Sequence, residues 1–150
     1  MSTNSNNRTV EAYLFFNGNC EEAVAFYQKA IGAEVTEKIR FSESPDPAPR
    51  GVVPEGFENK IMHCRFRVGN TSIMASDGCK VGSPTFEGFS LTITVMDEAD
   101  ADRVFNALAE GGRVAMPPGK TFWSPRFGML TDQFGVQWMI NTLPKDQQQG

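Results

Sequence analysis

The chain has 150 residues, which is one domain's length and enough to bury a core without disulfides or a structural metal. Its 14 basic and 18 acidic residues give a formal net charge of −4, which argues against nucleic-acid binding because phosphate contacts need a clustered basic face. The sequence has no apolar run long enough to cross a bilayer and no signal-peptide pattern, so we expect a cytoplasmic protein that does not bind membranes.

The first predicted elements are an extended segment over 10–16 (VEAYLFF) and a helix that begins near residue 20. Asn19 can accept a hydrogen bond from the first helical turn, and Glu22 follows three residues on, a variant of the capping box. Gly32 supplies the left-handed residue at which many helices end. Between these ends the apolar positions at helical spacing are Ala23, Phe26, Tyr27, Ala30 and Ile31. This stripe predicts an amphipathic helix.

Three extended segments follow this helix. They read EVTEKIRF, KIMHCRFRV and TSIMAS. The proline-rich stretch 44–56 between the first two has no apolar period and is predicted to be a loop.

The segment over 61–68 alternates between two kinds of side chain. Cys64 and Phe66 lie on one side, and His63, Arg65 and Arg67 lie on the other. We expect the apolar side to face the helix and the basic side to face away from it.

The second half of the chain repeats this order. Apolar residues alternate with Ser90, Thr92 and Thr94 in segment 89–95, and Asp97 can cap the next helix. That helix has an apolar stripe at Ala101, Val104, Phe105 and Leu108 and precedes two glycines, Gly111 and Gly112. Three extended segments follow, RVAMP, FGMLTD and VQWMIN, and the last two are joined by a tight turn between Asp132 and Gly135.

We interpret the chain as an α+β protein with two βαβββ modules, at about 10–78 and 88–142, in a single domain. The polar ends, 1–8 and 145–150, are expected to be disordered. Each helix covers one face of its sheet, so we expect the other faces of the two curved sheets to enclose a cavity lined by hydroxyls and a few basic groups.

Three stretches carry a resemblance to a known superfamily: NGNCEEAVAFYQKAIGAE (17–34), KIMHCRFRVGNTSIMASD (60–77) and TFWSPRFGMLTDQFGVQWMIN (121–141). They resemble the vicinal-oxygen-chelate superfamily of glyoxalases, bleomycin-resistance proteins and extradiol dioxygenases. The closer resemblance is to its PhnB-like branch, often labelled after 3-demethylubiquinone 3-methyltransferase. The resemblance implies the paired βαβββ fold and a cavity often completed by a second module or a second chain. It selects no reaction, because the superfamily includes several enzyme classes and non-catalytic drug-binding proteins.

The resemblance also implies where a metal ion would be held. Metalloenzymes of the superfamily use His, Glu or Gln at four strand positions, and these correspond here to Ala12 or Tyr13, Met74, Ser90 and Met139. None of these side chains is a good ligand for a hard or borderline divalent ion. We therefore expect no metal site. We also expect no cofactor, because the sequence lacks the glycine-rich strand-to-helix turn that nucleotide-like cofactors use.

His63 is the only histidine and the one candidate for a catalytic base. With Arg65 as a forked donor beside it, it can contact an anionic or carbonyl-bearing ligand. The alternative is a structural histidine bonded at a sheet edge or dimer contact. Arg67 is expected to be solvated.

The three cysteines are an odd set without a C-x-x-C pair, which favours free thiols in a reducing compartment. Cys20 opens a helix, where the macrodipole favours a reactive thiolate, but Glu21 and Glu22 oppose that effect. Cys64 is expected in the core and Cys79 in a loop.

The aromatic side chains near the end of the chain have two interpretations. Trp123, Phe127, Met129 and Trp138 either form a platform for a planar ligand or belong to the core.

Together these features favour a homodimeric protein that binds a small polar or anionic molecule without a metal ion. The predicted ligand-binding residues are His63, Arg65, Met74, Ser90, Thr92, Trp123 and Met139. One alternative is a lyase or isomerase of the glyoxalase superfamily, either metal-dependent or using His63 as base. A purely structural interaction domain is a third, although it leaves the polar strand faces unexplained.

Overall fold

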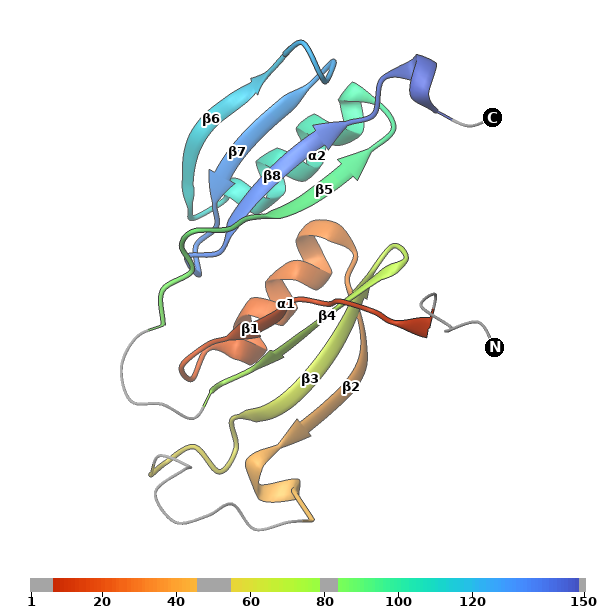
Figure 1. Cartoon of the computed structure of the whole chain (residues 1–150). Helices are drawn as coiled ribbons and strands as arrows, with labels where there is room; N and C mark the ends of the chain where they lie inside the picture. Colours follow the sequence, from red (N-terminus) through yellow and green to blue (C-terminus); the bar gives the residue numbers. More distant parts are fainter. Residues whose placement is uncertain (1–6, 46–54, 79–83, 149–150) are drawn as a thin grey trace. The chain divides into compact units, whose positions relative to one another are not determined.

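The computed structural model describes residues 7–45, 55–78 and 84–148. The chain divides into two compact units, the first ending at Pro84 and the second beginning at Thr85, and each contains one βαβββ module (Figure 1). Within the described ranges, no helix is both long enough and apolar enough to cross a lipid bilayer. Cys79 and most of the predicted loop over 44–56 lie outside the described residues.

The first module confirms the predicted order of elements. Its elements are β1 (Tyr13–Phe15), α1 (Cys20–Ile31), β2 (Glu34–Arg40), β3 (Ile61–Val68) and β4 (Thr71–Ser76), with a short 3-10 helix, η2 (Phe41–Glu43), after β2. The strands lie in the order β1-β4-β3-β2. The first and last strands of the module pair in parallel, and the other pairs are antiparallel.

The second module has the same topology. Its elements are β5 (Leu91–Val95), α2 (Glu98–Ala109), β6 (Arg113–Gly119), β7 (Phe127–Thr131) and β8 (Gln137–Thr142), followed by a 3-10 helix, η3 (Lys145–Gln147). The strand order β5-β8-β7-β6 again places the first strand parallel to the last. Both sheets are therefore mixed, and the fold class is α+β as predicted.

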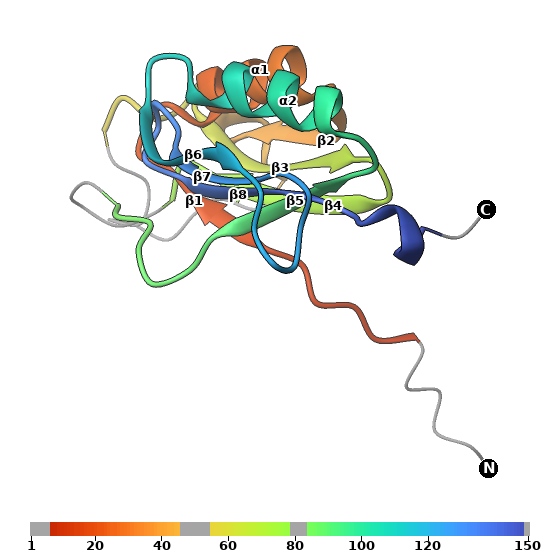
Figure 2. The same cartoon turned by 90° about the horizontal axis from the view of Figure 1, so that it is seen from above.

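One side of each sheet is covered by the module's own helix (Figure 2). In the first module Tyr27 of α1 stacks on Phe66 of β3, with ring centroids 5.8 Å apart, and both are fully buried. In the second, α2 approaches β7 so closely that a Cβ atom at Gly128 would lie 2.7 Å from the Phe105 ring. The predicted stripe of α2 is thus the helix face that packs on its sheet. The stripe predicted for α1 is only partly right, because the buried residues of α1 are Cys20, Ala23, Val24 and Tyr27.

The two helices begin in different ways. Asp97 caps α2 as predicted, because its side chain accepts a hydrogen bond from the Asp100 amide. The prediction that Asn19 caps α1 is wrong, since its side chain makes no capping hydrogen bond. The acceptor is Asp77, which follows β4 and bonds to the Cys20 amide at 2.8 Å. Gly32 ends α1 in the left-handed conformation, at φ 69°, as predicted.

Part of the C-terminal stretch differs from the expectation that it is disordered. Lys145–Gln147 form η3, and the Gln148 side chain donates hydrogen bonds to the carbonyls of Met96 and Leu143 at 2.7 and 2.9 Å. The polar composition of this stretch gave no sign of these backbone partners.

Candidate functional site

The uncovered face of the first sheet carries the basic residues identified in the sequence. Cys64 and Phe66 of β3 are buried on the helix side, while His63 and Arg65 are only partly buried and point to the other face. The alternation of β3 is therefore confirmed, and both candidate residues lie on one open face.

Arg65 is held by contacts from three other segments. Its Nη1 donates to Glu11 Oε1 at 2.8 Å, its Nε lies 3.7 Å from Glu37 Oε2, and its Nη2 donates to the Met74 thioether at 3.4 Å. The hydrogen bond and the charge of Glu11 raise the pKa of Arg65 above its ordinary value. The guanidinium is thus a fixed positive charge in the middle of this face.

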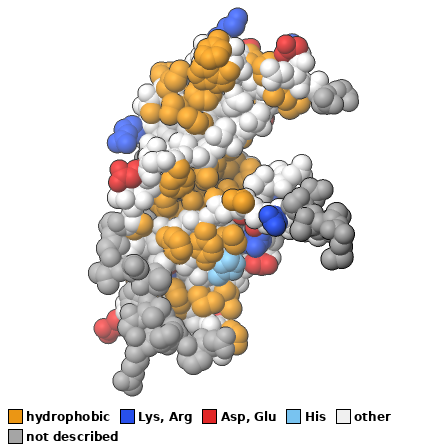
Figure 3. Space-filling model, in the orientation of Figure 1, with side chains coloured by type: hydrophobic (Ala, Val, Ile, Leu, Met, Phe, Trp, Pro, Cys, Tyr) orange, Lys and Arg blue, Asp and Glu red, His pale blue; other side chains and the backbone are white. Residues whose placement is uncertain are grey.

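His63 lies beside this cation and has a polar partner at each ring nitrogen. Its Nδ1 is 3.0 Å from the Tyr13 hydroxyl, and its Nε2 is 3.4 Å from Glu37 Oε2. Tyr13 also stacks on Phe15, with ring centroids 4.9 Å apart, and the two residues are 36% and 51% exposed. The histidine therefore lies between a polar cluster and an apolar one, and in Figure 3 its pale blue surface borders hydrophobic, acidic and basic groups.

We call this group the open-face cluster. Its members are Glu11, Tyr13, Glu37, His63, Arg65 and Met74. It brings together three of the predicted ligand-binding residues. The sequence interpretation missed both carboxylates. Glu11 alternates in step with Tyr13 and Phe15, so it is expected on the same side of the strand and could have been found from this pattern. Glu37 lies opposite Arg65 because of a register shift between β2 and β3, which no local pattern reveals.

The remaining predicted residues lie in the second module. Thr92 pairs with Met139 across β5 and β8, and its hydroxyl donates to the Met139 sulfur at 3.7 Å. Ser90 is half-buried just before β5. Trp123 lies between β6 and β7, is 46% exposed, and makes an edge contact with Phe127 at 5.2 Å.

Two of the four aromatic and methionine candidates belong to the second module's core. Trp138 is fully buried and its indole N–H donates to the Asp132 carboxylate at 2.8 Å, and Phe127 is 7% exposed. Asp132 also accepts from the Phe134 and Val136 amides, which confirms the predicted aspartate turn. Only Trp123 presents a large exposed ring surface among these candidates.

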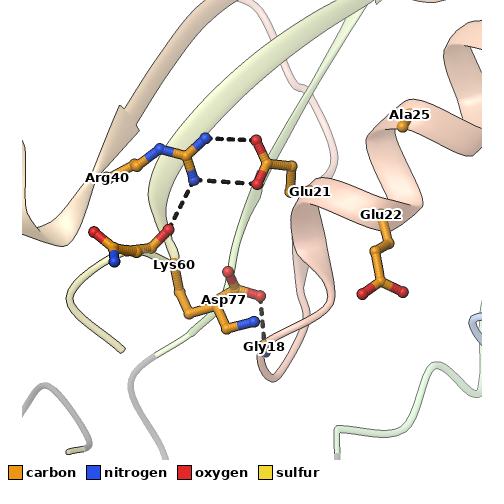
Figure 4. A pocket seen from close by; sticks show the side chains of 8 residues that line it. Gly18, Glu21, Glu22, Ala25, Arg40, Lys60 and Asp77 are labelled. Atoms are coloured by element: carbon orange, nitrogen blue, oxygen red, sulfur yellow. Dashed lines mark hydrogen bonds and ion pairs between the residues drawn. The ribbon is translucent and has the colours of Figure 1, made fainter. Parts of the chain in front are cut away.

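A separate cavity of about 430 Å³ opens at the start of α1 (Figure 4). It is lined by Gly18, Glu21, Glu22, Ala25, Arg40, Asn59, Lys60 and Asp77. Arg40 donates to both carboxylate oxygens of Glu21, at 3.1 and 2.6 Å, and to the Asn59 carbonyl, and this pairing lowers the pKa of Glu21. The Glu21–Arg40 pair thus joins α1 to β2.

The described part of the chain contains no group of three or more His, Cys, Asp or Glu side chains arranged to hold a metal ion. Of the positions that the superfamily resemblance relates to metal ligands, Tyr13 contacts His63, Met74 contacts Arg65, and Met139 contacts Thr92.

Comparison with known families gives one match that spans most of the chain. A family described as 3-demethylubiquinone-9 3-methyltransferase matches residues 8–141. Protein YjdN of Escherichia coli is 38% identical over 136 residues, which cover 87% of this chain and 92% of that protein.

Solved structures show the same similarity in three dimensions. Protein PA1353 from Pseudomonas aeruginosa is 43% identical, covers 91% of this chain and 98% of its own, and superposes with a TM-score of 0.80. The PhnB protein from Bacillus cereus is 28% identical, with coverages of 90% and 99% and a TM-score of 0.71. The fosfomycin resistance protein FosX of Listeria monocytogenes, crystallised with Mn(II) and sulfate, is 10% identical with a TM-score of 0.60 over 92% of each chain, so it shares the fold alone.

Proposed function

Because the chain belongs to the 3-demethylubiquinone-9 3-methyltransferase family, the PhnB-like branch of the vicinal-oxygen-chelate superfamily, we propose that its open-face cluster binds a small polar or anionic molecule without a metal ion. Family membership fixes the fold but no reaction, since one fold supports many activities. The proposal therefore depends on the chemistry of the cluster.

The observation that carries the proposal is the environment of Arg65. Its Nη1 is engaged by a carboxylate, but its Nη2 is directed at the sulfur of Met74, which is a weak acceptor. A carboxylate or phosphonate oxygen that replaced this sulfur contact would gain a charge-assisted hydrogen bond. His63 beside it can add a second polar contact, and the exposed rings of Tyr13 and Phe15 offer apolar surface for the rest of the ligand.

The same contacts support the proposal that binding needs no metal ion. The guanidinium of Arg65 repels a cation placed among its neighbours, and Met74 already contacts that guanidinium. In the second module Met139 contributes a thioether, which is a poor ligand for a hard ion such as Mn²⁺.

The test is a thermal-shift screen of the full chain against small carboxylates, phosphonates and divalent metals. A ligand that binds only the folded state raises the melting temperature. We expect stabilisation by an anionic compound and none by Mn²⁺, Ni²⁺ or Zn²⁺. Stoichiometric metal retained after mild chelation, or stabilisation by metals alone, would contradict the proposal.

A matched pair of variants then places the site. Arg65→Ala should weaken binding of the anionic compound by about 1.5–3 kcal/mol, because a charge-assisted contact is lost. Arg67→Ala is the control, since Arg67 lies on the same face of β3 but is half-exposed and pairs with Glu34 at 2.6 Å. Equal affinities for the two variants would mean that the ligand binds elsewhere.

A second candidate function is a lyase or isomerase reaction with His63 as base. The contacts of His63 with the Tyr13 hydroxyl and with Glu37 favour it, because an imidazole oriented by a carboxylate is a common general base. Conversion of the ligand distinguishes the two functions. Under the binding proposal neither the wild type nor His63→Gln converts the ligand, and the variant keeps most of its affinity. Under the catalytic alternative the wild type converts the ligand, whereas His63→Gln binds it but no longer converts it.

A further inference from the structure

Two buried cysteines meet on the helix side of the first sheet, away from the open-face cluster. Cys20 is the first residue of α1 and Cys64 lies in the middle of β3, and their Sγ atoms are 3.8 Å apart. Both are free thiols with almost no exposed surface. The sequence pattern predicted a core role for Cys64 but did not indicate that Cys20 lies against it.

The segments that carry these thiols are fixed to each other by one carboxylate. Asp77 accepts hydrogen bonds from the backbone amides of Cys20 and of Ile61, each at 2.8 Å, and Ile61 lies three residues before Cys64 on β3. The start of α1 is thereby held beside β3. The two sulfurs must approach by a further ~1.8 Å to reach the disulfide bond length of ~2.05 Å, a distance comparable to that covered by a side-chain rotation.

We propose that Cys20 and Cys64 form a redox-active pair that peroxide oxidises to an intramolecular disulfide. The disulfide would join the N-terminus of α1 to the central strand of its sheet. This modification site uses the helix-covered side of the module and is independent of ligand binding on the open face.

Cys64 is the thiol that reacts first. It lines a cavity of about 240 Å³ between α1 and β2, together with Val24, Gln28 and Lys38, which gives a small oxidant a route to its sulfur. The hydrogen bond with Cys20 lowers the pKa of Cys64, whereas the same hydrogen bond and burial raise the pKa of Cys20. The thiolate is the nucleophile, and Cys64 lines the cavity from which an oxidant would come, so we assign the first oxidation to Cys64.

The chemistry balances with hydrogen peroxide as the only oxidant. The Cys64 thiolate attacks one peroxide oxygen, the O–O bond breaks, and sulfenic acid and hydroxide form, the hydroxide taking up the thiol proton as water. The Cys20 sulfur then attacks the sulfenic sulfur and releases a second water. The two thiols lose two electrons and two protons, and one peroxide takes them up to become two waters.

The experiment uses the full chain with Cys79→Ser, so that only the proposed pair remains. The reduced protein is treated with hydrogen peroxide and quenched, and its thiols are counted after denaturation, with and without dithiothreitol. We expect both thiols to disappear and to return on reduction.

Two further measurements identify the cross-link. Peptide mapping should find residues 20 and 64 in one disulfide-linked peptide. The oxidised protein should melt at a higher temperature than the reduced protein, because a cross-link restricts the unfolded chain.

Two further variants separate the roles of the thiols. Cys20→Ala in the same background should stop at a sulfenic acid that dimedone labels at Cys64, and Cys64→Ala should leave Cys20 unmodified. The proposal is overturned if both thiols survive in the folded protein at a peroxide concentration that oxidises it when unfolded. Disulfide-linked dimers, or thiol loss that dithiothreitol does not reverse, would overturn it as well.

Discussion

Replacing Asp77 with alanine should destabilise the first module more than a typical buried substitution does. The carboxylate is 2% exposed and accepts three backbone hydrogen bonds. Its Oδ1 bonds to the amides of Gly18 and Cys20, and its Oδ2 bonds to the amide of Ile61, each at 2.8 Å. One side chain thus satisfies donors from the loop before α1, from α1 itself and from β3.

The expected loss follows from counting these donors. A buried donor left without a partner costs about 1–3 kcal/mol, and water entering the space left by the carboxylate would recover part of that. Three donors therefore predict a loss of roughly 3–6 kcal/mol. Because small domains have a total stability of about 5–15 kcal/mol, Asp77→Ala should leave the first module marginally stable or unfolded.

Urea unfolding of the full chain, followed by circular dichroism, measures this loss. Asp77→Asn is the matched control, because an amide oxygen can still accept from Gly18 and Cys20 while its NH₂ group opposes the Ile61 amide. We expect an intermediate loss of about 1–3 kcal/mol for this variant. If Asp77→Ala unfolds within about 1 kcal/mol of the wild type, the three hydrogen bonds do not hold the module together.

Three further predictions concern other parts of the chain. Gly112→Ala should lower stability by about 1–3 kcal/mol in calorimetry, because its Cβ would collide with the Thr131 carbonyl. Gly119→Ala should change stability little, because its Cβ would meet only the Pro117 carbonyl oxygen, at 4.0 Å. Equal effects of the two substitutions would refute this. Arg40 lowers the pKa of Glu21, so the ion pair stabilises the fold above pH ~4.5, and this stabilisation is lost as the pH falls through the pKa of Glu21 in the folded state. Glu21→Gln should remove this pH dependence, and the stability lost should be less than ~1 kcal/mol because the pair is half-exposed. Identical pH profiles of stability for the wild type and the variant would count against it. We also propose a homodimer, because each four-stranded sheet in the described part of the chain ends in two edge strands that could pair with a second copy. Light scattering that shows a monomer at high micromolar concentration would exclude it.

Local patterns in the sequence were sufficient to predict interactions between residues that are close in the chain, and to predict which side of a strand each residue occupies. Asp97 caps α2 through an amide three residues away, and the alternation of β3 placed His63 and Arg65 on the open face. In both cases a short stretch of sequence contains all the residues that determine the geometry.

Features that depend on strand register were not predictable in this way. The start of α1 is capped by Asp77 from 57 residues away, and Glu37 reaches Arg65 only because β2 contains a register shift. The contact between Cys20 and Cys64 likewise requires the packing of α1 on β3. Each of these interactions joins segments whose spacing in sequence carries no signal of their proximity.

The parallel pairing of the first and last strands has a consequence for the order of folding. β1 completes its sheet only against β4, with Tyr13 opposite Met74, and β5 only against β8, with Leu91 opposite Trp138. The β3–β4 and β7–β8 hairpins are local and can form early, whereas the terminal pairings close long loops and must come late. During synthesis the first module can therefore close before β8 has been made. Pulsed hydrogen exchange during refolding should show that β1 amides gain protection with or after those of β4, and earlier protection of β1 would exclude this order.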